Sequence, residues 1–287
     1  MSMSLGQADK TVQKLWDKDA NAWETRWVPI FRKFARDLIL DSKISSGQIV
    51  LDIGTGTGIA SFDAAKWARP EGFVVGIDRS KSMLAVAKAG SADRRLKNIR
   101  FIVMDGERLL FPDSIFDVVT SNCGIFSVGF HQTVAEVFRV LRRGGIFVYN
   151  EWHLNDVPVH RIFSEILLRH RTKNPSRKLR IQRVALAALE RFGNREMNLN
   201  AQVRELRREG FKKVEVKPRN YKIALHGIEG YLDMRLERAT LRQELAELSA
   251  AGREKLLYAF KDGLRQFVRH GRFLFDWKVT FVRAKKT

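Results

Sequence analysis

The chain has 287 residues, of which 45% are hydrophobic, a composition typical of a folded domain rather than a disordered chain. Its apolar runs are much shorter than the roughly 20 residues that cross a bilayer, and its first ten residues lack the features of a signal peptide. The single cysteine, Cys123, excludes an internal disulfide and a cysteine-cluster metal site. We therefore expect a cytoplasmic protein without a bound metal.

The chain is strongly basic, with a net charge of +20. Residues 1–150 carry 21 Lys and Arg against 16 Asp and Glu, whereas residues 151–287 carry 31 against 16. Such an excess can serve an anionic membrane surface, RNA or an acidic ligand. It is equally compatible with a solvated basic surface, so the net charge does not identify a binding partner.

Residues 1–46 show helical periodicity and include Trp16, Trp23 and Trp27. We expect them to form an N-terminal helical cap over one edge of the following domain. The three tryptophans are typical of packing residues.

Residues 47–153 alternate between strand and helix patterns, which predicts a parallel sheet covered by helices. This is the doubly wound α/β class. The second helix should end at the helix-breaking Gly90. The expected strands span 48–54, 72–78, 98–105, 115–122 and 144–152, and the helices 59–68, 80–90 and 132–145.

Residues 154–199 form a basic insert that we expect to be helical and to cover the substrate. From Ile181, apolar residues recur at helical spacing, namely Val184, Ala185, Ala188, Leu189 and Phe192. Residues 200–287 return to the α/β pattern and should complete the sheet, with further helices and a last antiparallel strand over 272–286.

A glycine loop follows the first strand, with Gly54, Gly56 and Gly58 after Asp52. The third glycine comes one residue earlier than in dinucleotide-binding loops. Asp78, at the end of the second strand, could accept hydrogen bonds from two ribose hydroxyls. The loop therefore predicts a nucleoside-containing ligand without a pyrophosphate. Further polar or small residues end the third and fourth strands: Asp105, Gly106, Ser121, Asn122 and Cys123.

Four segments, "VLDIGTGTGIA", "GIDRSKSML", "MDGERLLFPDSIFDVVTSNCGIF" and "EVFRVLRRGGIFVYNEW", resemble the class I S-adenosylmethionine-dependent methyltransferases. The chain is most similar to the branch of quinone C-methyltransferases and related small-molecule enzymes. The resemblance extends loosely over the tail from about residue 200. It implies a Rossmann-like sheet of seven strands, S-adenosyl-L-methionine as cofactor, and methyltransferase activity.

The resemblance also implies residue roles around the methionine part of the cofactor. The backbone of Gly54, Thr55, Gly56 and Gly58 would pass close to it. Asp52 would lie near its charged amino end, although the same aspartate could cap the next helix.

For the nucleoside, the resemblance implies that Asp78 holds the ribose and that Met83, with Arg79 beside it, packs on the adenine. Asp105 would accept from the adenine amino group, and the backbone of Gly106 would meet the ring edge. Met83 could alternatively be a core residue, and Gly106 a turn residue.

Three more residues would complete the pocket by the same resemblance. Ser121 and Asn122 would line it below the sulfonium, and Trp16 would lie over the cofactor, where relatives commonly have a tyrosine nearby.

A catalytic base is needed only where the acceptor loses a proton. His131, Glu151 and His153 lie near expected strand ends, and we favour His153. Each could instead be a polar surface residue. The "SNCG" segment lacks the Asn/Asp-Pro-Pro-aromatic motif of enzymes that methylate exocyclic amines, and Cys123 lacks the context of a covalent nucleophile.

We therefore predict direct methyl transfer to a small hydrophobic acceptor, quinone-like or lipid-like. One alternative is an RNA methyltransferase that uses the basic half. Another is a noncatalytic cofactor-binding subunit, because no base is convincing from the sequence. The oligomeric state remains open.

Overall fold

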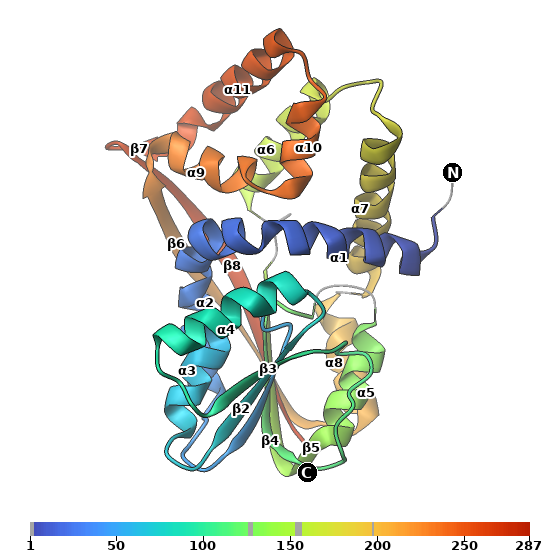
Figure 1. The fold of residues 1–287 in the computed structure, drawn as a ribbon, viewed down its shortest axis with the longest axis vertical. Helices are drawn as coiled ribbons and strands as arrows, with labels where there is room; N and C mark the ends of the chain where they lie inside the picture. Colours follow the sequence, from blue (N-terminus) through green and yellow to red (C-terminus); the bar gives the residue numbers. More distant parts are fainter. Residues whose placement is uncertain (1–2, 126–128, 153–156, 197) are drawn as a thin grey trace.

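The computed structural model of the protein describes residues 3–125, 129–152, 157–196 and 198–287. Figure 1 shows an α/β half built on a twisted sheet and a helical half beyond the carboxyl ends of its first strands. The N-terminal helix α1 (Leu5–Ala22) lies across the junction between the two halves. This junction is where the candidate site is found.

The sheet has the strand order β3-β2-β1-β4-β5-β8-β6 in the described part of the chain, with the short β7 paired to β8. Strands β1 to β5 are parallel to one another, and β8 runs antiparallel to both β5 and β6. The predicted α/β class and the antiparallel last strand are therefore confirmed. The strands are β1 Ile49–Ile53, β2 Phe73–Asp78, β3 Ile99–Val103, β4 Phe116–Asn122, β5 Leu141–Trp152, β6 Lys212–His226, β7 Val268–Arg269 and β8 Arg272–Lys285.

Helices cover both faces of this sheet because its central strands are apolar on both sides. One face packs on α2 (Val28–Ser42), α3 (Ile59–Ala68) and α4 (Lys81–Asp93), and the other on α5 (Phe130–Val140) and α8 (Leu199–Glu209). The chain reverses its winding between β1 and β4, and ligands of such sheets bind at this switch point.

Two predicted helix ends are wrong. Helix α4 continues past Gly90 to Asp93, and Gly90 makes room for the ring of Phe62 within the helix. A Cβ at Gly90 would lie 3.0 Å from Phe62 Cζ. Helix α5 ends at Val140, and the glycines that the sequence placed at its end belong to β5, which is continuous from Leu141.

The N-terminal segment covers a face of the sheet and the strand ends, where the sequence predicted an edge. A short π-helix, Trp23–Trp27, joins α1 to α2. The buried side chains of α2, including Phe31, Phe34 and Leu38, belong to the core over β4, β5 and β8. An apolar stripe of this width needs a sheet face rather than an edge.

The helical cap is built from two separate segments of the chain. The predicted insert gives α6 (Pro158–His170) and α7 (Arg177–Glu196). Helices α9 (Gly227–Leu236), α10 (Ala239–Ala246) and α11 (Ala250–Leu264), between β6 and β8, join them. Phe163 of α6 stacks on Phe260 of α11 with ring centroids 4.2 Å apart. None of the described helices is both long and apolar enough to span a membrane.

Candidate functional site

A cavity of about 730 Å³ lies where the strand ends meet α1 and the cap. One end is lined by the segments that follow β1, β2 and β3, namely 53–57, 78–80 and 104–107. The other end has aromatic walls and cap residues: Trp16, Trp23, Phe31, Trp152, Leu186, Leu189, Arg238 and Thr240. We call these the strand end and the aromatic end of the cavity.

The three predicted glycines serve two different purposes. Gly54 and Gly56 line the cavity with positive φ angles of 64° and 56°. A Cβ on Gly54 would lie 2.7 Å from Gly124 Cα, so this position requires glycine for a close backbone approach. A Cβ on Gly56 would meet no protein atom within 4 Å. Gly58 is not on the wall and instead allows Phe62 to pack at the start of α3.

Asp52 is completely buried and is not among the cavity-lining residues. Its carboxylate accepts hydrogen bonds from Ser61 Oγ at 2.7 Å and Thr120 Oγ1 at 2.9 Å. Burial raises its pKa. Asp52 therefore ties the end of β1 to α3 and β4. Its place near the charged amino end of the cofactor stays a prediction.

Ser121 is similarly placed beneath the cavity, and its hydroxyl donates to the carbonyl of Ile53 at 2.8 Å. Asn122 is on the wall, as predicted, and its side-chain oxygen accepts from Asn150 Nδ2 at 2.9 Å. Cys123 also lines the cavity, and burial raises its thiol pKa, which favours the neutral form.

Asp78 lies on the wall at the end of β2. Its two carboxylate oxygens accept from the backbone N–H groups of Gly56 at 2.9 Å and Ser80 at 2.8 Å. Burial raises the pKa of this carboxyl. Because a carboxylate has about four acceptor positions, Asp78 retains capacity for ribose hydroxyls.

Arg79 lines the cavity but is held by the N-terminal helix. Its two Nη atoms donate to the carboxylate of Asp9 at 2.5 and 2.6 Å, and one lies 3.4 Å from Asp105. The hydrogen bonds to Asp9 raise the pKa of Arg79. Two further contacts fix α1 over the same segment, from Gln13 Nε2 to the Arg79 carbonyl at 3.0 Å and from Ser80 Oγ to Asp17 at 2.6 Å.

The structure brings the other predicted binding residues together around the same cavity. Met83 is buried at the strand end, beside the loop that follows β3. Trp16 of α1 also lines the cavity. The predicted residues that line the cavity are Trp16, Gly54, Thr55, Gly56, Asp78, Arg79, Met83, Asp105, Gly106, Asn122 and Glu151.

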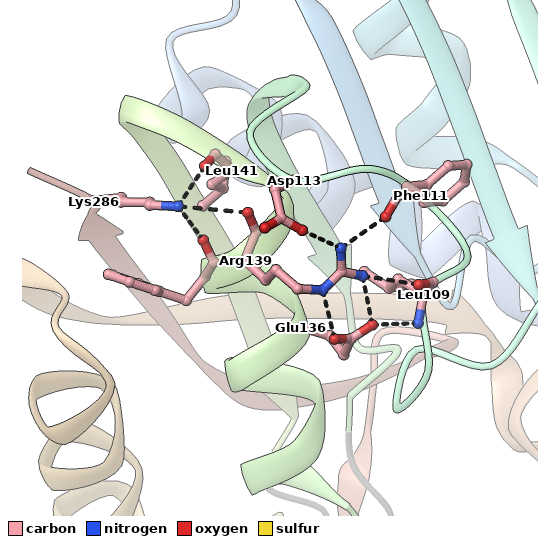
Figure 2. A network of polar contacts seen from close by, with 8 residues as sticks. Leu109, Phe111, Asp113, Glu136, Arg139, Leu141 and Lys286 are labelled. Atoms are coloured by element: carbon pink, nitrogen blue, oxygen red, sulfur yellow. Dashed lines mark hydrogen bonds and ion pairs between the residues drawn. The ribbon is translucent and has the colours of Figure 1, made fainter.

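A network around Arg139 holds the loop that carries Asp105 and Gly106 (Figure 2). The guanidinium donates to the carbonyls of Leu109 and Phe111 at 2.8 and 2.7 Å and is bound by Glu136. Lys286 closes the end of α5 by donating to main-chain carbonyls, including that of Leu141 at 2.7 Å. The "FRVLRR" segment thus contributes to the site by anchoring a loop.

Of the three candidate bases, Glu151 is the one that the structure places in the cavity. It accepts from Gln202 Nε2 at 2.8 Å, and Gln202 Oε1 accepts from the Tyr149 hydroxyl at 2.7 Å. Burial raises the pKa of Glu151 to about 8. A carboxyl with this pKa can exchange a proton near neutral pH.

The two histidine candidates have other positions. His131 begins α5, outside the cavity, and pairs with Glu205 of α8, close to Arg208. It is therefore part of a contact between two helices rather than a base. His153, the favoured candidate, lies outside the described residues.

Sequence reasoning missed several residues of the aromatic end. Trp152 follows directly from Glu151 on β5, and stacks on Trp277 with centroids 5.9 Å apart. Phe31 reaches the cavity from α2, and Arg238 from the start of α10. The aromatic content of these segments was visible in the sequence, whereas no pattern around Arg238 signals a site.

The geometry defines a class I, Rossmann-like methyltransferase fold with a capped cavity at its switch point. The profile of a family described as "Methyltransferase domain" matches residues 44–213. The chain belongs to this methyltransferase family.

Known relatives are similar over part of the chain. A demethylmenaquinone methyltransferase of Lactococcus lactis is 35% identical over 126 residues, 44% of this chain and 50% of the relative. Aklanonic acid methyltransferase DauC of Streptomyces sp. is 36% identical over 116 residues, 40% of this chain and 53% of the relative. The chain thus spans about half the length of these curated relatives.

A solved structure shares the fold. Phosphoethanolamine N-methyltransferase 2 of Haemonchus contortus, in complex with phosphomonomethylethanolamine and S-adenosylhomocysteine, matches with a TM-score of 0.52 at 20% identity. The match covers 94% of this chain and 57% of that chain.

Proposed function

We propose that the protein transfers a methyl group from S-adenosylmethionine to a small, planar and largely apolar acceptor. The observation that carries this proposal is the single cavity that joins the strand end to the aromatic end. The strand end offers exposed backbone and carboxylate acceptors for the methyl donor, and the aromatic end offers a surface on which an organic ring can pack.

The strand-end residues fit S-adenosylmethionine. The open space at Gly56 admits a ligand against the backbone, and Asp78 retains hydrogen-bonding capacity for ribose hydroxyls. Asp105 and Gly106 provide an acceptor and a close backbone at the end of the next strand. When bound, the cofactor supplies an activated methyl group, so the protein chiefly aligns the acceptor and excludes water.

The aromatic end supports an organic acceptor of the quinone-like kind. The rings of Trp16, Trp23, Phe31 and Trp152 form its walls, and flat apolar walls favour a flat ligand. The names of the demethylmenaquinone and aklanonic acid methyltransferases agree with a small organic acceptor. Where the acceptor carries a hydroxyl, the deprotonated form of Glu151, a minority at neutral pH because its pKa is about 8, would accept its proton.

The surface of the cap favours an anionic membrane over RNA as the partner of the basic half. Residues 158–180 and 250–272 carry 13 Lys and Arg against three Asp and Glu, a net charge of +10. Leu168 and Tyr258 are 56% and 74% exposed on the same helices. A basic face with exposed apolar side chains is suited to the interface of anionic lipids.

The decisive first experiment is calorimetric titration with S-adenosylhomocysteine, with NADH as the control ligand. We expect binding of the first ligand only, and a loss in Asp78→Ala on the order of 1.5–3 kcal/mol. Radiolabelled methyl transfer is then measured to 1,4-naphthoquinol and to total RNA. Absence of S-adenosylhomocysteine binding would overturn the proposal, and transfer to RNA alone would replace the acceptor class.

A further inference from the structure

Arg238 places a guanidinium group among the tryptophans of the aromatic end. Its Cζ lies 4.4 Å from the ring centroid of Trp16 and 5.5 Å from those of Trp23 and Trp27. The side chain is 17% exposed and lines the cavity. A cation stacked on aromatic rings in this way is held in a fixed orientation.

One carboxylate partly balances this charge. Asp19, which is fully buried, lies 2.8 Å from Arg238 Nε, accepts from the backbone of Ala239 at 2.5 Å, and lies 4.0 Å from Arg242. A single acid thus faces two guanidinium groups. Burial lowers the pKa of Arg238 to about 10, which leaves it cationic at neutral pH.

The outer nitrogens of Arg238 remain available to a ligand. A guanidinium has five N–H donors, and Asp19 is contacted through Nε. Within the ranges that the structure describes, neither Nη atom donates a hydrogen bond. Arg79, another cationic residue on the cavity wall, already donates both of its Nη groups to the carboxylate of Asp9.

Two lining carboxyl groups neighbour residues of the aromatic end in sequence, since Glu190 follows Leu189 on α7 and Glu151 precedes Trp152 on β5. Glu190 of α7 is an exposed residue, where solvent screens its charge. Glu151 is largely protonated at neutral pH, because burial raises its pKa to about 8. Neither group therefore opposes an anion beside Arg238 strongly.

We infer that Arg238 binds an anionic oxygen of the acceptor, a carboxylate or a phenolate, while the ring that carries it lies among the tryptophans of the aromatic end. Paired N–H donors in a partly dry site bind such an oxyanion through charge-assisted hydrogen bonds. This inference rests on the proposed function, and it narrows the substrate class to aromatic acids and ionisable phenols.

The test compares two probes with the same ring system, 2-naphthoate and the neutral 2-naphthalenemethanol. Binding is followed by tryptophan fluorescence and calorimetry with saturating S-adenosylhomocysteine. The wild-type protein should bind the anion about tenfold or more tightly than the alcohol. Titrating 2-naphthol between about pH 7 and 9 distinguishes the sources, because tighter binding as it ionises identifies phenolate recognition.

The matched variant is Asp19→Asn combined with Arg238→Gln, which removes both charges of the buried pair together. It should bind the two naphthalene probes equally while retaining its affinity for S-adenosylhomocysteine. Arg238→Lys keeps the charge without the planar fork and should show an intermediate preference. Arg253→Gln, an exposed change on α11, is the control and should behave as wild type.

Equal affinity for the two probes in the wild-type protein, failure of both to bind it, or an unchanged preference in the double variant and in Arg238→Lys would overturn the inference. Loss of S-adenosylhomocysteine binding by the wild-type protein would contradict the proposed function instead. The probe preference is then measured without that ligand and still decides the role of Arg238.

Discussion

At the scale of single residues, Gly54 and Gly56 both have positive φ angles but face different surroundings. In Gly54→Ala the new methyl group would lie 2.7 Å from Gly124 Cα, so we expect a loss of stability of about 2–4 kcal/mol from strain and overpacking. In Gly56→Ala the methyl group enters the cavity, and the positive φ alone should cost about 1–2 kcal/mol.

Urea denaturation and titration with S-adenosylhomocysteine separate the two effects. Gly56→Ala should bind the ligand more weakly even under conditions in which the variant is fully folded, because the methyl group enters the cavity. Equal stability losses in the two variants would contradict this distinction, and full affinity in Gly56→Ala would contradict the cofactor position.

Glu151 is a residue whose protonation links stability to pH. Its pKa is about 8 in the folded protein, against an ordinary value of 4.5. Between these values the unfolded chain has lost a proton that the folded protein keeps, so the free energy of unfolding falls as pH rises. Glu151→Gln should remove this fall, which is on the order of a few kcal/mol.

Urea denaturation at a series of pH values between about 5 and 8 measures this dependence. Glu190→Gln, on the exposed side of the same cavity, is the control and should follow the wild-type curve. Parallel curves for wild type and Glu151→Gln would show that burial does not raise the pKa of the Glu151 carboxyl.

At the scale of elements, α1 is held over the cofactor site by contacts repeated every four residues, at Asp9, Gln13 and Asp17. Asp9→Asn removes the ion pair with Arg79, in which both side chains are mostly buried. We expect the free energy that holds α1 in place to fall by about 1–2 kcal/mol, which lies between the contributions of exposed and buried ion pairs. Hydrogen exchange of α1 should accelerate, and S-adenosylhomocysteine should bind severalfold more weakly.

Asp63→Asn, which breaks the exposed pair with Lys66 on α3, is the matched control and should leave both measurements unchanged. If exchange in α1 is the same in Asp9→Asn and wild type, the ion pair does not hold the helix.

The same elements show which parts of the site can be predicted from sequence. The strand ends at Asp78 and Asp105 are marked by local patterns, because a buried strand, a tight turn and a helix follow one another within about ten residues. The position of α1 and the approach of Arg238 depend on contacts between segments some 70 and 220 residues apart. No local pattern encodes such contacts. A buried acid and a ligand-binding acid look alike in a motif, so the sequence did not show that Asp52 is absent from the cavity wall.

At the scale of the whole molecule, the charge of +20 is concentrated on the cap, where 158–180 and 250–272 hold a net +10. We expect the protein to co-sediment with phosphatidylglycerol vesicles, but not with phosphatidylcholine vesicles, at low salt. Each basic residue at the surface contributes about 1 kcal/mol to such binding, and salt screens it within about 10 Å at 0.1 M.

Exposed apolar side chains should add a contribution that salt does not remove. The double change Leu168→Ser and Tyr258→Ser should therefore lower the binding that persists at high salt. Leu40→Ser, at a residue 51% exposed on α2 in the α/β half, is the matched control and should have no effect. Equal binding to both kinds of vesicle would mean that the basic residues do not drive binding. RNA binding that survives physiological salt while vesicle binding does not would mean that the cap does not meet a membrane. A planar acceptor dissolved in lipid would then have to reach the aromatic end of the cavity through water.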